Sequence, residues 1–210
     1  WYLASNLPTD KDTGTADRLG NWHLLPGLEP AGIPRGLAGT ATPFSYNQID
    51  DLKLIVDQHG EDLAAIVMEP TRDQPPAPGF LEAARELADQ CGARLIFDEI
   101  TIGWRLCLGG SHLMYDIQPD IAVFAKSLGN GHPMTAVIGT EETMQAAQDT
   151  FVSSSYWTES VGPVAALATI RKMMRVDVPG HVAHIGQAVQ QGIRQLAVRH
   201  EVPVEPRGYP

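Results

Sequence analysis

Short apolar runs alternate along this chain with amphipathic stretches that have the period of a helix. Four runs rich in β-branched or aromatic residues predict buried strands, at residues 64–68, 93–97, 121–124 and 135–138. Apolar residues at helical spacing predict helices at residues 47–59, 80–90, 141–148, 161–175 and 181–200. Because strands that alternate with helices are typical of βαβ units, the pattern predicts an α/β fold with a mainly parallel sheet flanked by helices.

The two ends of the chain break this alternation. Residues 1–46 are rich in Gly, Pro and polar residues, which predicts a loop excursion over a larger domain. The last two predicted helices follow each other without a strand, which indicates a departure from the sheet. We therefore expect a large domain over residues 1–175, with its N-terminal portion missing, and the start of a smaller C-terminal domain over residues 176–210. The first residue is not Met and residues 201–206 resemble the start of a strand, so we expect a fragment of a longer polypeptide.

Composition narrows the class of protein. The 210 residues are 43% apolar and 19% charged, as in ordinary soluble globular proteins. A net charge of −10 without a basic stripe argues against nucleic acids and anionic membranes as partners. No apolar stretch approaches the roughly 18 residues of a membrane span. Two cysteines, Cys91 and Cys107, form neither a disulfide framework nor a zinc pattern, which favours a cytoplasmic location, and the histidines lack the spacing of metal ligands.

Ionisable residues stand at the ends of three predicted strands. Glu69 follows the first, Asp98 and Glu99 the second, and Lys126 the third. Parallel strands present their carboxyl ends at one edge of the sheet, where ligands bind. An amine and a carboxylate at one edge suit a cationic heterocycle held through a Schiff base. The structural alternatives are a lysine that extends to water and an acidic pair that caps a helix or binds Arg105.

An acidic pair after an apolar strand also resembles the magnesium-binding strand of P-loop ATPases. That class requires the motif G-x-x-x-x-G-K-[ST], which these residues do not contain. The pattern therefore argues against an ATPase.

The strand ends belong to a longer series of motifs. In chain order they are Glu69-Pro70, then Asp98-Glu99-Ile100-x-x-Gly103-Trp104-Arg105, then Pro119-Asp120-Ile121, then Lys126-Ser127-Leu128-Gly129-Asn130-Gly131-x-Pro133. This series resembles the class III pyridoxal-phosphate aminotransferases, in the branch similar to glutamate-1-semialdehyde aminomutase, and the matching segments span about residues 1–200.

The resemblance implies the large domain of a fold-type I transferase, which binds pyridoxal 5′-phosphate (PLP) and forms homodimers with shared active sites. Its substrates would be a small-molecule amino donor and a carbonyl acceptor. It implies that Lys126 attaches the cofactor covalently and that Asp98 pairs with the pyridinium nitrogen. Ile100 would pack on the ring, and the hydroxyl of Ser155 would contact the cofactor phosphate across the dimer interface. Glu69 would orient nearby groups in the cofactor site.

Departures from the family pattern leave alternatives open. The phosphate-binding turn of the family belongs upstream of Trp1, so we expect the isolated chain to bind cofactor poorly and to be inactive. Residues 71–74 (TRDQ) replace the Gln-x-Glu gate of ornithine- and GABA-type members, and Arg72 is a candidate receiver of a substrate carboxylate. A shorter run of glycines after Lys126 favours an aminotransferase over an aminomutase; a non-catalytic fragment is the further alternative.

Overall fold

The computed structural model describes residues 2–7 and 28–210. It divides into two compact units, Trp1–Leu63 and Ala64–Pro210. The second unit contains the sheet and every residue that the motifs single out.

The described residues of the first unit form four helical segments. They are η1 (Tyr2–Asn6), η2 (Arg35–Leu37), α2 (Ile49–His59) and η3 (Gly60–Asp62). Helix α2 confirms the helix predicted at residues 47–59, and it buries Leu52 and Ile55. Before it, the amide and hydroxyl of Ser45 donate to Oδ2 of Asp51 at 3.2 and 2.7 Å, which fixes the entry of the chain into the helix. Residues 8–27 of the expected loop excursion lie outside the described residues.

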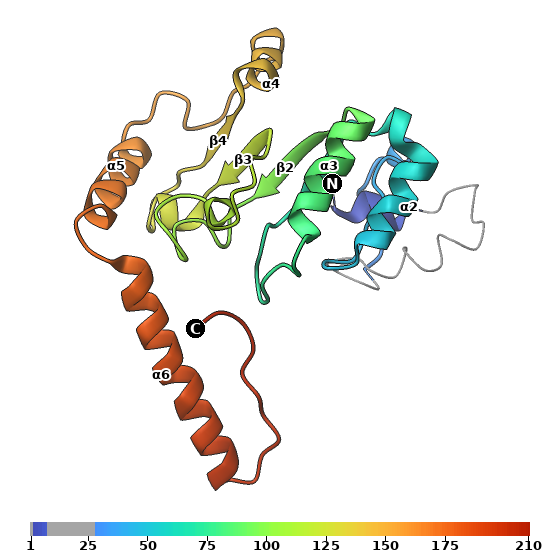
Figure 1. Cartoon of the computed structure of the whole chain (residues 1–210). Helices are drawn as coiled ribbons and strands as arrows, with labels where there is room; N and C mark the ends of the chain where they lie inside the picture. Colours follow the sequence, from blue (N-terminus) through green and yellow to red (C-terminus); the bar gives the residue numbers. More distant parts are fainter. Residues whose placement is uncertain (1, 8–27) are drawn as a thin grey trace. The chain divides into compact units, whose positions relative to one another are not determined.

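The second unit is built on a four-stranded sheet with the order β1-β2-β3-β4 (Figure 1). Its strands are β1 (Ala65–Met68), β2 (Arg94–Asp98), β3 (Ile121–Phe124) and β4 (Ala136–Gly139). The first three pair in parallel, as predicted, whereas β4 pairs with β3 in the antiparallel sense. The reversal follows from the connection, because residues 125–135 contain only the short η5 (Lys126–Leu128) and no crossover helix.

Helix α3 (Phe80–Cys91) runs beside β1 and β2 (Figure 1). It buries Phe80, Leu81, Ala84 and Ala88 on one stripe, the pattern expected of an amphipathic helix over a sheet. Gly92 ends it with a φ of 71°, a left-handed conformation that favours glycine. The later helices are α4 (Glu141–Gln145), η6 (Ala146–Asp149), α5 (Val161–Met173) and α6 (Val178–Arg199). All the predicted helices are therefore present, although the one at 141–148 is split in two.

The two faces of the sheet are covered unequally within this unit. Alternate strand residues are buried on one face; they are Ile66, Met68, Leu95, Phe97, Ala122 and Phe124. The residues between them, including Val67, Ile96 and Val123, are only half-buried. Because side chains alternate along a strand, Asp98 at the end of β2 points to the half-buried face.

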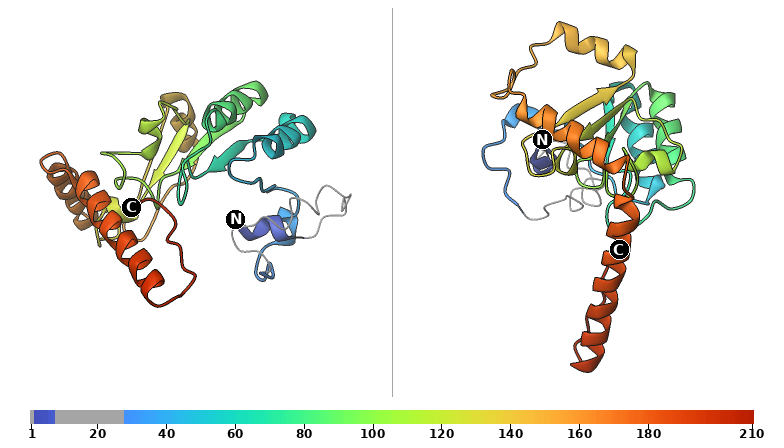
Figure 2. Two further views of the ribbon diagram at one scale, coloured as in Figure 1. Left: turned by 60° about the horizontal axis from the view of Figure 1, so that its bottom comes forward. Right: turned by 90° about the vertical axis from the view of Figure 1, so that its left-hand side faces the viewer.

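The chain after α6 turns back along that helix, as Figure 2 shows. Gln190 Nε2 donates to the carbonyl of Gly208 at 3.1 Å, and Arg194 pairs with Glu205 at 2.9 Å. As predicted, no strand separates α5 from α6. Among the described residues, no helix combines the length and the apolar character needed to cross a membrane.

Candidate active site

The register of the sheet brings Glu69, Asp98 and Lys126 to one edge. Met68 is opposite Phe97, so Glu69 comes next to Asp98 on the neighbouring strand. Asp98 is in turn opposite Val123, and Lys126 follows three residues later. The parallel pairing therefore places all three ionisable groups at the carboxyl end of the sheet, as the sequence predicts.

Lys126 begins the turn that follows β3. Its φ is 46°, a left-handed conformation that is uncommon for a residue with a side chain. The exposed side chain extends to the loop after β2, where its Nζ donates to Oγ1 of Thr101 at 2.9 Å. Lys126 forms no salt bridge with any described residue, so its amine is held by a neutral hydroxyl.

Asp98 also shapes the loop after β2. Its Oδ1 accepts a hydrogen bond from the amide of Ile100 at 3.0 Å, which bends the backbone just beyond the strand. Ile100 is half-buried. The carboxyl group and the aliphatic side chain thus lie two residues apart at the same strand end.

The charges of both other groups affect the pKa of Glu69. Burial raises the pKa of Glu69; Arg72 and Lys126 act to lower it, while the charge of Asp98 raises it further. The net effect is a raised pKa. Arg72 pairs with Glu69 over 3.5 Å, from the loop that follows β1.

Glu99 points to the opposite face from Asp98 and is fully buried, with 0% of its surface exposed. It accepts hydrogen bonds from Ser111 Oγ at 3.0 Å and from the amide and Nδ1 of His112 at 3.0 and 2.8 Å. Burial raises the pKa of Glu99, but the hydrogen bonds from His112 and Ser111 outweigh it, so that the pKa is lowered. Glu99 is therefore an anchor of the loop, and His112 is a core histidine with its hydrogen bond satisfied.

Arg105, which was a possible ion-pair partner of Asp98 and Glu99, forms its hydrogen bond with another residue. Arg105 Nε donates to the carbonyl of Thr101 at 2.7 Å, and Arg105 forms no salt bridge with a described carboxylate. Within the same loop, a Cβ at Gly103 would lie 2.6 Å from the carbonyl oxygen of Glu99, so glycine is required there. This close packing fixes the loop in which Thr101 accepts the hydrogen bond from Lys126.

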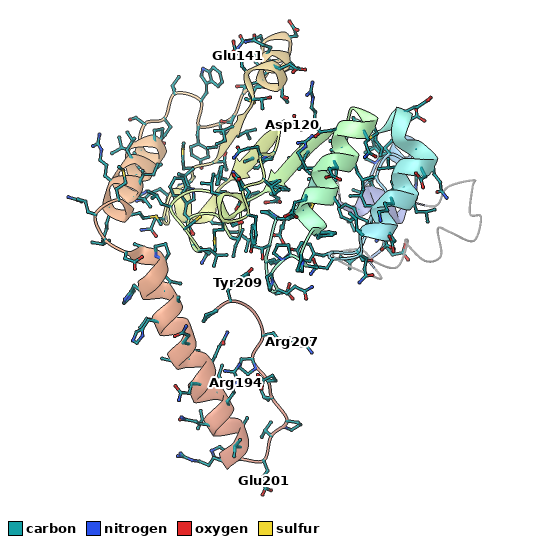
Figure 3. All side chains as sticks on the ribbon, viewed as in Figure 1. Asp120, Glu141, Arg194, Glu201, Arg207 and Tyr209 are labelled. Atoms are coloured by element: carbon teal, nitrogen blue, oxygen red, sulfur yellow. The ribbon has the colours of Figure 1, made fainter. Side chains whose placement is uncertain are left out.

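A chain of three hydroxyl groups extends from the loop after β1. Thr71 Oγ1 and Tyr209 OH are 2.7 Å apart, and Tyr209 OH lies 3.2 Å from Tyr115 OH. Burial and the neighbouring Tyr209 raise the pKa of Tyr115 to about 12. Figure 3 labels Tyr209 on the segment that returns after α6. These contacts tie that segment to the loop of Arg72, and no pattern in the sequence indicates them.

Ser155 lies in the segment that connects η6 to α5. It belongs to residues 151–158, which are all exposed. Its predicted phosphate contact requires a second subunit and stays a prediction. The same segment exposes 96% of Phe151 and 70% of Trp157.

Comparison with known proteins gives the family. The model of the aminotransferase class-III family matches residues 35–209. The chain belongs to the class III aminotransferases. The resemblance in the motifs is thereby confirmed, and this class III chain spans about half the length of the curated relatives it matches.

Two relatives of the chain are named for different activities. The 3-aminobutyryl-CoA aminotransferase of Cloacimonas acidaminovorans (strain Evry) is 37% identical over 196 residues, which cover 90% of the class III chain and 47% of the relative. A glutamate-1-semialdehyde 2,1-aminomutase of Brevibacillus brevis (strain 47 / JCM 6285 / NBRC 100599) is 32% identical over 180 residues, or 80% of the chain and 42% of the relative.

Solved structures confirm the fold. The FumI protein of Sphingopyxis sp. MTA144 superimposes with a TM-score of 0.77 at 26% identity, over 86% of the class III chain and 44% of FumI. An omega-transaminase from Sphaerobacter thermophilus gives a TM-score of 0.74 at 27% identity, over 88% and 43% of the two chains.

Proposed function

We propose that this class III chain is part of a PLP-dependent aminotransferase that moves an amino group from an amino donor to a carbonyl acceptor. The observation that supports the proposal best is the register that sets the carboxylate of Asp98 and the amine of Lys126 at one edge of the sheet. Family membership and the relatives named as aminotransferases agree with it.

The residues present fit the cofactor. The amine of Lys126 is exposed, and among the described residues its hydrogen-bond partner is a neutral hydroxyl, so it is available for covalent attachment. Asp98, on the half-buried face, would hold a proton on the pyridine nitrogen. Ile100 would pack against the ring, Glu69 would orient neighbouring groups, and Ser155 of a second subunit would bind the phosphate.

When it is bound, PLP supplies an electron sink for the pair of electrons that a broken C–H bond leaves behind. The chain supplies the proton transfer. Nζ of Lys126 would be the base that takes the proton from the amino-bearing carbon of the substrate.

Replacement of Lys126 in the full-length protein tests the proposal. We expect the wild type to show the visible absorbance band of a lysine-bound cofactor and Lys126→Ala to lack it. Lys172→Ala, which removes an exposed lysine of α5, is the matched control and should keep the band. Full-length protein without a band at saturating PLP would exclude the function and favour a non-catalytic protein.

An aminomutase is the second candidate, since relatives with 31–32% identity bear that name. Such an enzyme returns the amino group to the same carbon skeleton. Incubation of glutamate 1-semialdehyde alone separates the two functions, because an aminotransferase requires a second substrate and an aminomutase does not.

Assembly and organisation complete the proposal. We propose a cytoplasmic homodimer with shared active sites, supported by the exposed apolar segment at residues 151–158 and by the low cysteine content. We also propose that the chain is a fragment in which residues 176–210 begin the smaller domain. The absence of buried residues from α6 supports this, since a helix with exposed apolar side chains needs further packing partners.

A further inference from the structure

We infer that Glu99 is a positioning residue for the proposed reaction. Its side chain points away from the reacting groups, but its hydrogen bonds hold the backbone that presents Asp98 and Thr101 to them. The inference rests on the proposed function and deepens it, because it adds to that site a residue for which the sequence motifs indicate no role. Glu99 would act through its neighbours on the amine of Lys126.

The side chain of Glu99 is fixed inside the core, on the face opposite to Asp98. Glu99 and its partners Ser111 and His112 are all buried. Oε1 of Glu99 accepts from both the amide and the Nδ1 of His112, while Oε2 accepts from Ser111 Oγ. Since no water reaches this carboxylate, a rotation of the side chain would leave buried donors without an acceptor, which is unfavourable.

The backbone of Glu99 is fixed as well. Its amide donates to the carbonyl of Val123 in β3 at 2.9 Å, and its carbonyl accepts from the amide of Gly103 at 2.9 Å. The side chain reaches the short helix η4 (Ser111–Met114). One residue thus joins the end of β2 to the neighbouring strand, to the turn at Gly103 and to η4.

The residues on both sides of Glu99 make the contacts of the proposed site. Asp98 precedes it, and Asp98 Oδ1 accepts from the amide of Ile100 at 3.0 Å. Thr101, two residues after Glu99, accepts the hydrogen bond from Nζ of Lys126 at 2.9 Å. A rotation of the backbone at Glu99 would therefore displace the carboxylate and the hydroxyl together. Groups that act in a reaction need such support, because small displacements weaken their effect.

Three substitutions in the full-length protein separate this role from a general loss of stability. Glu99→Ala removes the acceptor of three hydrogen bonds, and Ser111→Ala removes one of the donors. Glu99→Gln is the conservative variant, because its carbonyl can still accept from His112 and its amide can donate to the hydroxyl of Ser111. Asp120→Asn is the matched control, since it changes another carboxylate that binds a backbone amide, at the opposite end of the sheet.

Two measurements report on the loop and on the groups that it presents. The first is the rate of amide hydrogen exchange at residues 100–103 in protein without PLP, with the amides of α3 as the internal reference. The second is the pH midpoint at which the visible absorbance band of the lysine-bound cofactor changes. This midpoint depends on the charges around the lysine nitrogen and the pyridine nitrogen.

We expect Glu99→Ala to accelerate exchange at residues 100–103 by about 10-fold or more, because three hydrogen bonds are lost. The pH midpoint should rise by roughly 0.5–1 unit, the equivalent of one hydrogen bond. It rises because a displaced Asp98 holds the ring proton less well, and a ring without that charge favours a proton on the lysine nitrogen. Ser111→Ala should change both quantities less, in the same direction. Glu99→Gln and Asp120→Asn should stay near wild type in both.

A pH midpoint that Glu99→Ala leaves unchanged would overturn the inference. A shift of equal size in Glu99→Gln or in Asp120→Asn would also overturn it, because the former keeps the hydrogen bonds and the latter leaves the loop intact. If Glu99→Ala does not fold, Ser111→Ala decides by the same comparison. Failure of the proposed function has a different signature: wild type then shows no band at saturating PLP, and the inference fails with it.

Discussion

At the scale of single residues, the contact between Lys126 and Thr101 is the most direct clue to how the amine is handled. Nζ of Lys126 donates to Oγ1 of Thr101 at 2.9 Å. In the proposed reaction, Nζ of Lys126 would act as the base. Thr101 would hold the free amine in place during that step.

Thr101→Val removes this hydroxyl at nearly constant volume. We expect the first half-reaction of the full-length enzyme to slow by about 2- to 10-fold, the effect of losing one hydrogen bond between uncharged groups. Stopped-flow measurement of the cofactor absorbance checks the rate. Thr101→Ser keeps the hydroxyl and should react at nearly the wild-type rate. A Thr101→Val variant as fast as wild type would contradict the proposed role of the Thr101 hydroxyl.

The sequence predicts part of the site at this scale and misses another part. Alternation along a strand correctly separates Asp98 from Glu99, because the period of two is set by backbone geometry alone. The contact with Thr101 depends on a left-handed turn at Lys126 and on tight packing at Gly103. Neither feature has a periodic signature, so the positions of loop side chains could not be predicted from the pattern.

At the scale of elements, Asp120 holds the opposite end of the sheet together. Its Oδ2 accepts from Arg85 of α3 at 2.8 Å and from the amide of Leu95 in β2 at 2.7 Å, just before β3 begins. Burial raises the pKa of Asp120, but the hydrogen bonds from Arg85 and Leu95 outweigh it and the pKa is lowered. One carboxylate thus links two strands and a helix.

Asp120→Asn should lower the free energy of unfolding by about 1–3 kcal/mol, because the buried donors lose a charged acceptor. Urea denaturation at neutral pH measures the change. Asp89→Asn is the control: Asp89 also pairs with Arg85, but its side chain is 65% exposed, so the loss should stay below about 1 kcal/mol.

The pH dependence of the same residue has a definite sign. A carboxyl whose pKa is lowered by folding stabilises the native state above its unfolded pKa of about 3.9 and loses that contribution as the pH falls through the folded value. Wild type should therefore lose stability more steeply than Asp120→Asn below about pH 4. Equal slopes for the two proteins would contradict the lowered pKa.

Elements were the most predictable level of this structure. Each predicted strand and helix is present because the apolar period directly reflects which face is buried. The direction of β4 was not predicted, since it depends on the length of a connection and not on the period. The break between α4 and η6 was also missed, because it is a change from α-helical to 3₁₀-helical hydrogen bonding that leaves the order of apolar and polar residues unmarked.

At the scale of the whole molecule, the described residues expose apolar side chains that the proposed second subunit would cover. They gather in residues 151–158 and continue on α5, where Val164 and Leu167 are more than half exposed. Scattered exposed apolar residues are normal, but a contiguous patch marks an interaction surface. The proposed second subunit would cover it.

Trp157→Glu should convert the proposed dimer of the full-length protein to a monomer, because a charge would be buried in the interface. Light scattering coupled to size-exclusion chromatography measures the mass. Trp157→Phe retains an apolar ring and should stay dimeric. A glutamate variant with the mass of the wild-type assembly would contradict the placement of the interface.

The backbone at Lys126 has a consequence for how this protein can be improved. A left-handed residue with a side chain costs roughly 1–3 kcal/mol, a penalty that glycine would avoid. A screen for thermal tolerance alone should therefore enrich glycine at position 126 while discarding the reactive amine. Selection for stability in this protein must therefore be combined with an assay of activity, so that variants of Lys126 are rejected.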